Sequence, residues 1–412
     1  MSRQKFLLFT IVGLCIIIAG VGAYLFLAVF AGLNNHGTNV LPTVTSTQGA
    51  QVGSTCGITK NSDGSYRYSW LHVSSDGKIV NDSGCIVPLA GFNLGFLFLG
   101  DASGDDGHAI QAKIAWYKQT FHMNVVRINF NAQWWIDDAF VPKSHMHFRQ
   151  WLQSYVKWVE QKGSYVELDS GPHYPEPPCG GTITMCPSQN QGLKDYRANP
   201  NPTTALELEP NVAPNIQAWK DVAKLYANDP AVMYDALNEP LAIKDSRIFF
   251  EDMNTLINTI RAQNPRALVI VYEKHYDEIM SGTIPDYQQP NLVIDAHIYS
   301  GFSGISPATG QKCVEPGASQ WTPAQGFDKL VAFAHSHGHA VIINEWGGCY
   351  DEPQYHQQIV SFAKAQFIPL VYFQSGNVTN STGNGGNISF ALNGNGRLVQ
   401  AAYTSIVGAV SG

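Results

Sequence analysis

Residues 232–273 read VMYDALNEPLAIKDSRIFFEDMNTLINTIRAQNPRALVIVYE, and this stretch decides the fold. It begins and ends with apolar runs, at 232–238 and 267–273, which predict strands buried on both faces. Between the two runs apolar residues recur every three or four positions, which predicts a helix with one buried stripe. The stripe comprises Phe250, Met253, Leu256, Ile257 and Ile260. The stretch is therefore a βαβ unit with two parallel strands.

The same alternation of strand and helix extends in both directions from this unit. Further apolar runs predict strands near 86–93, 125–130, 164–170, 291–299, 340–345 and 368–374. Eight strand-helix alternations over about 330 residues predict a closed (β/α)₈ TIM barrel, with an open doubly wound sheet as the alternative. No Gly-x-Gly-x-x-Gly motif follows the first strand and no Walker motif occurs, which disfavours a nucleotide-binding open sheet.

The start of the chain predicts a membrane segment. Residues 1–33 contain a long uncharged apolar run that follows Arg3 and Lys5, which predicts a cytoplasmic tip and a transmembrane signal anchor. A cleaved signal peptide ending near Ala23 is the alternative. Either interpretation places the rest of the chain outside the cytoplasm, anchored to the membrane or secreted.

Two further segments precede the predicted barrel. Residues 34–52 are rich in Asn, Thr, Ser, Gly and Gln and predict a flexible linker. Residues 53–84 alternate aromatic and polar side chains around a Ser-Asp-Gly-Lys turn, which predicts a small β-hairpin. The hairpin and the barrel, at 85–412, together form the expected folded domain, 53–412.

The cysteine pattern predicts disulfides. Cys15 lies in the apolar run, and an even number of cysteines remains for an oxidising compartment. Proximity in the chain favours the pairs Cys56 with Cys85, Cys179 with Cys186, and Cys313 with Cys349, out of fifteen possible pairings. A zinc site is the competing interpretation, but no Cys-x-x-Cys pair occurs, so neither a metal nor another cofactor is expected.

Composition restricts the partners. The 412 residues carry a formal net charge of −7, and 44% of them are hydrophobic against 14% charged. An acidic chain has no basic face for the phosphates of nucleic acid, so a nucleic-acid partner is not expected. The hydrophobic fraction suffices for a large core, and the chain is expected to be a monomer.

Two glutamates stand at the carboxyl ends of predicted strands, where TIM barrels carry their active sites. Glu239 follows Asn238 after the fourth strand, and Glu345 follows Asn344 after the seventh. Paired carboxylates are the catalytic groups of retaining glycosidases, in which one protonates the leaving oxygen and the other attacks the sugar. An Asn-Glu-Pro turn that only caps a helix is the alternative for Glu239.

Together these positions resemble glycoside hydrolase family 5, the cellulase-like retaining group, over roughly residues 85–410. The resemblance implies that Glu239 is the acid/base and Glu345 the nucleophile, with no cofactor. It also implies a substrate-binding set of Arg127, His173, Asn238, His297 and Tyr299. By this resemblance the chain acts on a β-linked polysaccharide, most simply as an endo-β-1,4-glucanase.

One feature departs from the family pattern. The family ends its eighth strand with a tryptophan that contacts the sugar, whereas this chain has Phe373 in the same region. Phe373, Trp134, Trp135 and Trp346 are the candidate sugar platforms, with loop packing as the alternative for the pair at 134–135. A β-mannanase or β-1,3-glucanase, or a non-catalytic polysaccharide-binding surface protein, are the alternative functions.

Three other polar features have simpler interpretations. Arg127 could pair with Asp169 or Asp235 as a structural ion pair, and His297 and Tyr299 could be hydrogen-bonded core residues. A cluster of histidines at 335–339 falls at the end of a predicted helix, where histidines interact favourably with the helix dipole, and is taken as structural. Glu273, at the end of the fifth strand, has no assigned role.

Overall fold

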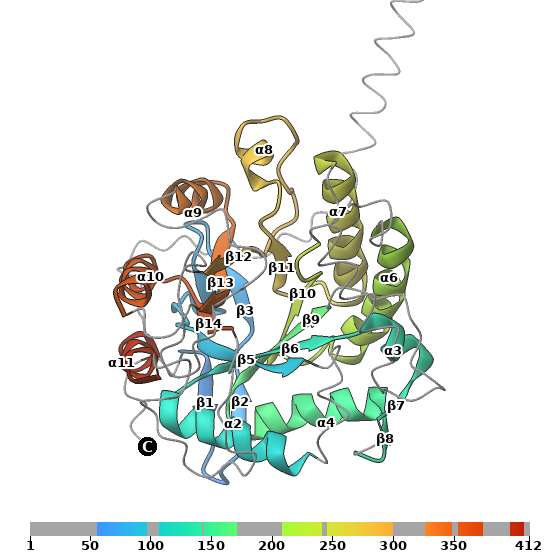
Figure 1. The fold of residues 1–412 in the computed structure, drawn as a ribbon, viewed down its shortest axis with the longest axis vertical. Coiled ribbons are helices and arrows are strands. Elements are labelled where there is room, and N and C mark those ends of the chain that lie inside the picture. Colours follow the sequence, from blue (N-terminus) through green and yellow to red (C-terminus); the bar gives the residue numbers. More distant parts are fainter. Residues whose placement is uncertain are drawn as a thin grey trace, which may run out of the picture. The chain divides into compact units, whose positions relative to one another are not determined.

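Eight parallel strands close into a barrel in the computed structural model of this chain (Figure 1). The structure describes residues 56–96, 107–141, 144–170, 208–240, 245–299, 326–347, 353–373 and 396–407. The expected anchor, linker and cysteine pairs 179–186 and 313–349, together with His173, lie outside these residues. Among the described residues no helix combines the length and apolar character that crossing a membrane requires.

The barrel strands occur in the same order in space as in sequence. They are β5 (Ala90–Phe96), β6 (Val125–Phe130), β9 (Tyr165–Ser170), β10 (Val232–Asp235), β11 (Val269–Tyr272), β12 (Leu292–Tyr299), β13 (Ala340–Gly347) and β14 (Leu370–Tyr372). The last strand pairs in parallel with the first, and Leu370 lies opposite Ala90. The closed barrel is thus confirmed, and the open sheet is excluded.

Helices follow the strands and surround the barrel (Figure 1). They are α2 (His108–Phe121), α3 (Ala132–Asp137), α4 (Phe148–Gln161), α6 (Leu208–Leu225), α7 (Ser246–Gln263), α8 (Tyr276–Met280), α9 (Phe327–Ser336), α10 (Pro353–Gln366) and α11 (Gly396–Val407). In α7, Met253, Leu256, Ile257 and Ile260 are buried as predicted, whereas Phe249 is buried in place of Phe250. Each apolar stripe therefore faces the barrel wall.

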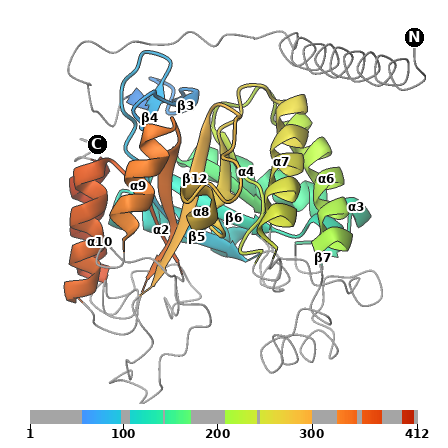
Figure 2. The ribbon, with the colours of Figure 1, turned by 90° about the horizontal axis from the view of Figure 1, so that it is seen from above.

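Small antiparallel sheets accompany the barrel. The segment expected to form one hairpin forms two, β1 (Ile58–Lys60) with β2 (Tyr66–Tyr68) and β3 (Leu71–Val73) with β4 (Ile79–Asn81). A third pair, β7 (Phe140–Val141) with β8 (Met146–His147), was not predicted. Figure 2 shows β3 and β4 at one end of the barrel.

The first hairpins cover the amino-terminal end of the barrel. The backbone N–H of Val73 donates to Asn291 Oδ1 at 2.7 Å, directly before β12 begins. Leu71 and Ile79 pack in one cluster with inward-facing strand residues such as Val125 and Tyr165. The predicted disulfide between Cys56 and Cys85 is confirmed and closes this segment. The floor of the barrel is therefore apolar and covered.

Candidate active site

Polar side chains occupy the barrel interior above its apolar floor. Because side chains alternate between the two faces of a strand, residues two positions beyond a floor residue also point inward. In β9, Tyr165 belongs to the floor, and Glu167 and Asp169 follow it; both are fully buried. In β6, Val125 is followed by Arg127 in the same way. A charged layer therefore lies directly above the floor.

A bulge in β13 turns two consecutive side chains into this layer. Ile343 lies opposite Ala296 of β12, yet Glu345 lies opposite His297, so β13 contains one extra residue. Asn344 donates from Nδ2 to Glu167 Oε1 at 2.6 Å, and Glu345 accepts from Arg127. Strict alternation would have sent one of the two side chains outward.

Glu239 follows the end of β10 in an unusual backbone conformation. Its φ angle is +37°, in the left-handed region that glutamate rarely adopts. Such strain costs of order 1–3 kcal/mol and is concentrated at functional sites. The Glu239 side chain is 26% exposed, whereas that of Glu345 is 6% exposed. The turn therefore presents Glu239 at the open end of the barrel.

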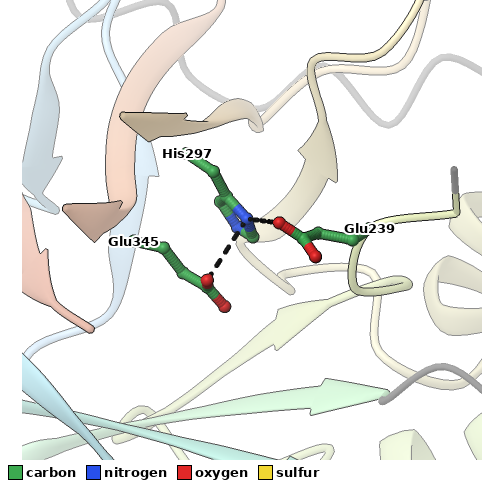
Figure 3. A group of neighbouring side chains, drawn as sticks. All are labelled: Glu239, His297 and Glu345. Carbon is green, nitrogen blue, oxygen red and sulfur yellow. Dashed lines mark hydrogen bonds and ion pairs between the residues drawn. The ribbon is translucent and has the colours of Figure 1, made fainter. Parts of the chain in front are cut away.

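His297 connects the two glutamates (Figure 3). Its Nδ1 lies 2.7 Å from Glu239 Oε1 and 3.4 Å from Glu345 Oε2. Its other nitrogen, Nε2, lies 3.0 Å from Asp295 Oδ2. One atom from each of the three residues Glu239, His297 and Glu345 can be chosen so that all lie within 4.8 Å of one another. The two carboxyl groups thus face each other across a narrow space.

The spacing of these three side chains also bears on metal binding. Within the described part of the chain, no other group of His, Cys, Asp or Glu meets the same proximity criterion. The donor atoms already bond to one another, and Arg127 bonds to Glu345. An ion is therefore not needed to hold them together, and we assign none.

Arg127 is the centre of the charged layer. Its Nη1 donates to Glu345 Oε1 at 2.7 Å and to Asn93 Oδ1 at 2.9 Å. Its Nη2 donates to Asn238 Oδ1 at 2.8 Å, and both Nε and Nη2 donate to Asp235 Oδ2. The guanidinium is thereby fixed in one orientation, because its donors bond in several directions.

Arg127 also forms ion pairs with Glu167 at 3.1 Å and with Asp169 at 3.0 Å. Asp169 accepts a further hydrogen bond from Asn129. The proposed structural ion pairs with Asp169 and Asp235 therefore exist together with the contact to Glu345. Arg127 is thus both a partner of the predicted nucleophile Glu345 and a structural ion-pair partner of Asp169 and Asp235.

Burial shifts the proton affinities in this layer. It raises the pKa of Glu167, Asp169 and Glu273 well above the ordinary value, although the Arg127 charge opposes the rise at the first two. It raises the pKa of Asp235 to about 6. His297 responds in the opposite direction, because the nearby carboxylates outweigh its burial and raise its pKa well above the usual value. These groups therefore bind protons more tightly than exposed carboxyl groups and histidines do.

Several predicted site residues meet here, and others do not. Asn238, Glu239, His297 and Glu345 converge near the carboxyl ends of β10, β12 and β13, and Arg127, the third residue of β6, contacts Glu345 and Asn238 from inside the barrel. Tyr299 ends β12, but its side chain is not described. Phe373 follows β14 and is half-buried, and its N–H donates to the carbonyl of Trp346.

The three predicted tryptophan platforms are buried side chains. Trp346 is 0% exposed and packs against Tyr372 and His356, because the bulge at Asn344 and Glu345 leaves it on the outer face of the barrel. Trp134 and Trp135, in α3, are 4% and 3% exposed. The expectation that these side chains offer flat faces to sugar is therefore not met. The pair instead packs in the short helix α3, where Trp134 contacts Phe148.

Three residues of the charged layer were not predicted from the sequence. Glu167, Asp295 and Asn93 were given no role, although each contacts a predicted site residue. The signal was present: acidic side chains two residues apart within otherwise apolar strands, as in YVELDS at 165–170. A buried strand carries such residues only where they find partners.

The histidines at 335–339 point to separate partners. His335 lies 3.4 Å from Lys78 Nζ, and His339 lies 3.2 Å from Asp286 Oδ2. The ring of His337 contacts the carbonyl of Phe333 within the last turn of α9. The three rings therefore do not share one ligand, in agreement with the structural interpretation.

Comparisons with known proteins agree with this architecture. The sequence model of the family described as "Cellulase (glycosyl hydrolase family 5)" matches residues 80–378. Endoglucanase Z of Dickeya dadantii is 30% identical over 102 residues, which span 24% of this chain and 23% of that protein.

Solved structures share the fold at low sequence identity. The catalytic domain of Thermobifida fusca endoglucanase Cel5A superposes with a TM-score of 0.54 at 13% identity, over 81% of this chain and 97% of that one. The catalytic domain of the major endoglucanase of Xanthomonas campestris pv. campestris gives a TM-score of 0.54 at 14% identity, over 82% and 99% of the two chains.

Proposed function

The chain belongs to the cellulase family, glycosyl hydrolase family 5, and is a glycoside hydrolase; within this class we propose that it is a retaining endo-β-1,4-glucanase. The observation that carries the proposal is the geometry of Glu239 and Glu345 around His297. The two carboxyl groups approach within 4.8 Å. Retaining glycosidases need carboxyl groups about 5–5.5 Å apart, whereas inverting ones need about 6.5–9.5 Å to admit a water.

In the proposed first step Glu345 is the nucleophile. Its carboxylate attacks the anomeric carbon, while Glu239 donates its proton to the leaving oxygen, which takes the electron pair of the broken C–O bond. Arg127, 2.7 Å from Glu345 Oε1, favours the ionised form of the nucleophile. Asn238 directs Oδ1 to Arg127, which leaves its amide N–H groups to donate to the sugar 2-hydroxyl.

In the second step Glu239 acts as the base. It takes a proton from water, the water oxygen attacks the anomeric carbon, and the bond to Glu345 breaks. Glu239 must therefore lose and regain one proton in each cycle. Its greater exposure, 26% against 6% for Glu345, suits a group that contacts both a leaving sugar and a water.

A substrate panel tests the proposal. Residues 53–412 are assayed on carboxymethyl cellulose, β-mannan and β-1,3-glucan, together with the Glu345→Ala and Glu239→Ala variants. We expect cleavage of the β-1,4-glucan and a loss of at least about a thousandfold in each variant. Full activity in both variants would contradict the mechanism. Binding without cleavage by the wild type would instead indicate a non-catalytic polysaccharide-binding protein.

The panel also addresses the two alternative substrates. Phe373 is half-buried at the end of the eighth barrel strand, where the family pattern has a tryptophan. A change of the aromatic platform alters how the sugar stacks while the carboxyl groups stay in place. Preferential cleavage of mannan or β-1,3-glucan would therefore replace the proposed substrate and keep the proposed mechanism.

We also propose that the enzyme acts outside the cytoplasm. The apolar run within residues 1–33 and the disulfide between Cys56 and Cys85 support export. Fractionation of cells that express the full chain tests this. Activity in membranes or medium is expected, and activity confined to the cytosol would contradict it.

A further inference from the structure

Asp295 lies behind His297 on the same strand, β12, and is not part of the mechanism above. Its side chain is 0% exposed, and its Oδ2 lies 3.0 Å from Nε2 of His297. Its second oxygen, Oδ1, has no hydrogen-bond partner among the described residues. A buried carboxylate costs free energy unless it is paired. The hydrogen bond to His297 and the attraction of the Arg127 charge are the favourable interactions of this carboxylate.

We propose that Asp295 is a positioning residue, which fixes a proton on Nε2 of His297 so that Nδ1 shares a single proton with Glu239. The proposal rests on the proposed function, because it concerns the proton that Glu239 gives and regains. Asp295 accepts a hydrogen bond from Nε2–H, so that nitrogen cannot accept one from another group. Nδ1 then has the only ring lone pair that can take a proton, and it lies 2.7 Å from Glu239 Oε1.

The shared proton can lie on either of two atoms, Nδ1 of His297 or Oε1 of Glu239. Either Nδ1–H of an imidazolium donates to the Glu239 carboxylate, or the protonated Glu239 donates to Nδ1 of a neutral ring. Moving the proton between Oε1 and Nδ1 changes no other bond and needs no further reactant. In the first half of the cycle the proton passes from Glu239 to the leaving oxygen, and in the second half water returns one.

The charges around the ring favour retention of this proton. Titratable groups from three other strands interact with His297. They are Glu345 on β13, Asp235 on β10 with Glu239 after it, and Tyr272 on β11 with Glu273 after it. Of the nearby carboxylates, Glu345 and Asp235 are paired with Arg127. Asp295 is the carboxylate that contacts Nε2, the ring nitrogen that does not face Glu239.

The variant Asp295→Asn tests the role of the charge. Asparagine has nearly the same shape, and its Oδ1 can still accept from Nε2–H, but it lacks the negative charge. The pair of His297 and Glu239 should then lose its shared proton at lower pH. We expect the alkaline limb of the kcat/KM profile on an aryl β-cellobioside to move down by about one pH unit or more. An unchanged limb in a folded variant would overturn the proposal.

A matched control exists in the same chain. Asp286 Oδ2 lies 3.2 Å from Nε2 of the buried His339, a similar pair outside the charged layer. Asp286→Asn should leave the pH profile unchanged. In the His297→Gln background, Asp295→Asn should cause no additional shift, because Asp295 acts through His297. An equal shift in both backgrounds would contradict the proposed route.

A measurement on the wild-type enzyme covers the case in which Asp295→Asn does not fold. In ¹⁵N NMR spectra of the histidine rings, the signals of His297 are those that are missing from the spectrum of the His297→Gln variant. Nε2 should carry a proton throughout pH 5–8, and only Nδ1 should change its state. An unprotonated Nε2 would overturn the proposal. This readout needs no turnover, so it stays informative if no glucan is cleaved and the proposed function fails.

Discussion

Replacing Arg127 with methionine should destabilise the enzyme strongly at neutral pH. The guanidinium pairs with Glu167, Asp169, Asp235 and Glu345 at 3.1, 3.0, 2.8 and 2.7 Å, and all these side chains are nearly or fully buried. Removing one partner of a buried ion pair costs about 3–5 kcal/mol, because the other charge stays buried without compensation. Methionine preserves the apolar stem but not the charge. We expect a loss of about 3–5 kcal/mol at pH 7, a large part of the stability of a typical domain.

The loss should be smaller at acidic pH. Burial already raises the pKa of Glu167, Asp169 and Asp235, and Arg127 opposes that rise. Without Arg127 these carboxyl groups retain protons to still higher pH. At pH 4 they are then largely neutral in the folded state, so less uncompensated charge is buried. We expect the loss at pH 4 to be about half of that at pH 7, or less.

Urea denaturation followed by tryptophan fluorescence at the two pH values measures both effects. Arg266→Met is the control, since Arg266 pairs with Asp82 at 2.9 Å on the surface and their side chains are 47% and 64% exposed. Its loss should be about 0–1 kcal/mol. A loss below about 1 kcal/mol for Arg127→Met at pH 7, or equal losses at both pH values, would show that Arg127 does not compensate buried carboxylate charge.

Three further predictions concern stability. The raised pKa of Asp235, about 6, contributes stability that is fully present below about pH 4 and is lost as pH rises through 6, so the urea midpoint of the wild type, measured relative to that of Asp235→Asn, should fall from pH 4 to pH 7; a relative rise would contradict it. Replacing Cys56 and Cys85 with serine opens a disulfide that joins residues 29 apart and should lower the unfolding free energy, measured by urea denaturation, by about 2–4 kcal/mol; an unchanged unfolding free energy would contradict it. Glu239→Asn should abolish activity yet stabilise the fold by about 1 kcal/mol, because asparagine adopts the left-handed backbone conformation more readily than glutamate does. A lower midpoint of thermal unfolding in this variant would argue against strain at this turn.

Much of the barrel could be predicted because its signals are local. The apolar run at 125–130 matches β6, and the run at 291–299 matches β12 to within one residue. The weakest match is at 86–93, where the strand begins later, at Ala90. That run also contains residues of the barrel floor, such as Val87 and Leu89. Apolar character alone does not distinguish a strand from the chain that leads into it.

The polar ends of the strands were predictable for a related reason. A polar residue that ends a buried strand lies at the carboxyl face of the barrel, so Glu239 and Glu345 approach each other as expected. Arg127 is instead the third residue of β6 and reaches Glu345 from inside the barrel. The contacts inside the barrel depend on which strands face each other across its interior. Asn344 of β13 donates a hydrogen bond to Glu167 of β9, and the two residues are 177 positions apart in the chain. A local sequence pattern cannot predict a contact between residues so far apart.

The error at Trp346 has a specific cause. The sequence predicts a strand that runs through Glu345, and Trp346 directly after a catalytic residue resembles a sugar platform. The bulge in β13 instead places Glu345 inside the barrel and Trp346 outside it, where its Nε1 lies 3.3 Å from the hydroxyl of Tyr403. Bulges arise from pairing between strands, and the sequence of one strand does not reveal them.

Trapping the covalent intermediate shows directly whether Glu345 is the nucleophile. The wild type is incubated with 2,4-dinitrophenyl 2-deoxy-2-fluoro-β-cellobioside, whose fluorine slows hydrolysis of a glycosyl-enzyme, and its mass is then measured before and after proteolysis. We expect one added fluorocellobiosyl group, on the peptide that contains Glu345. An enzyme that cleaves β-1,4-glucan yet gains no adduct, or carries it on another residue, would contradict the assignment of Glu345 as the nucleophile of a retaining hydrolase.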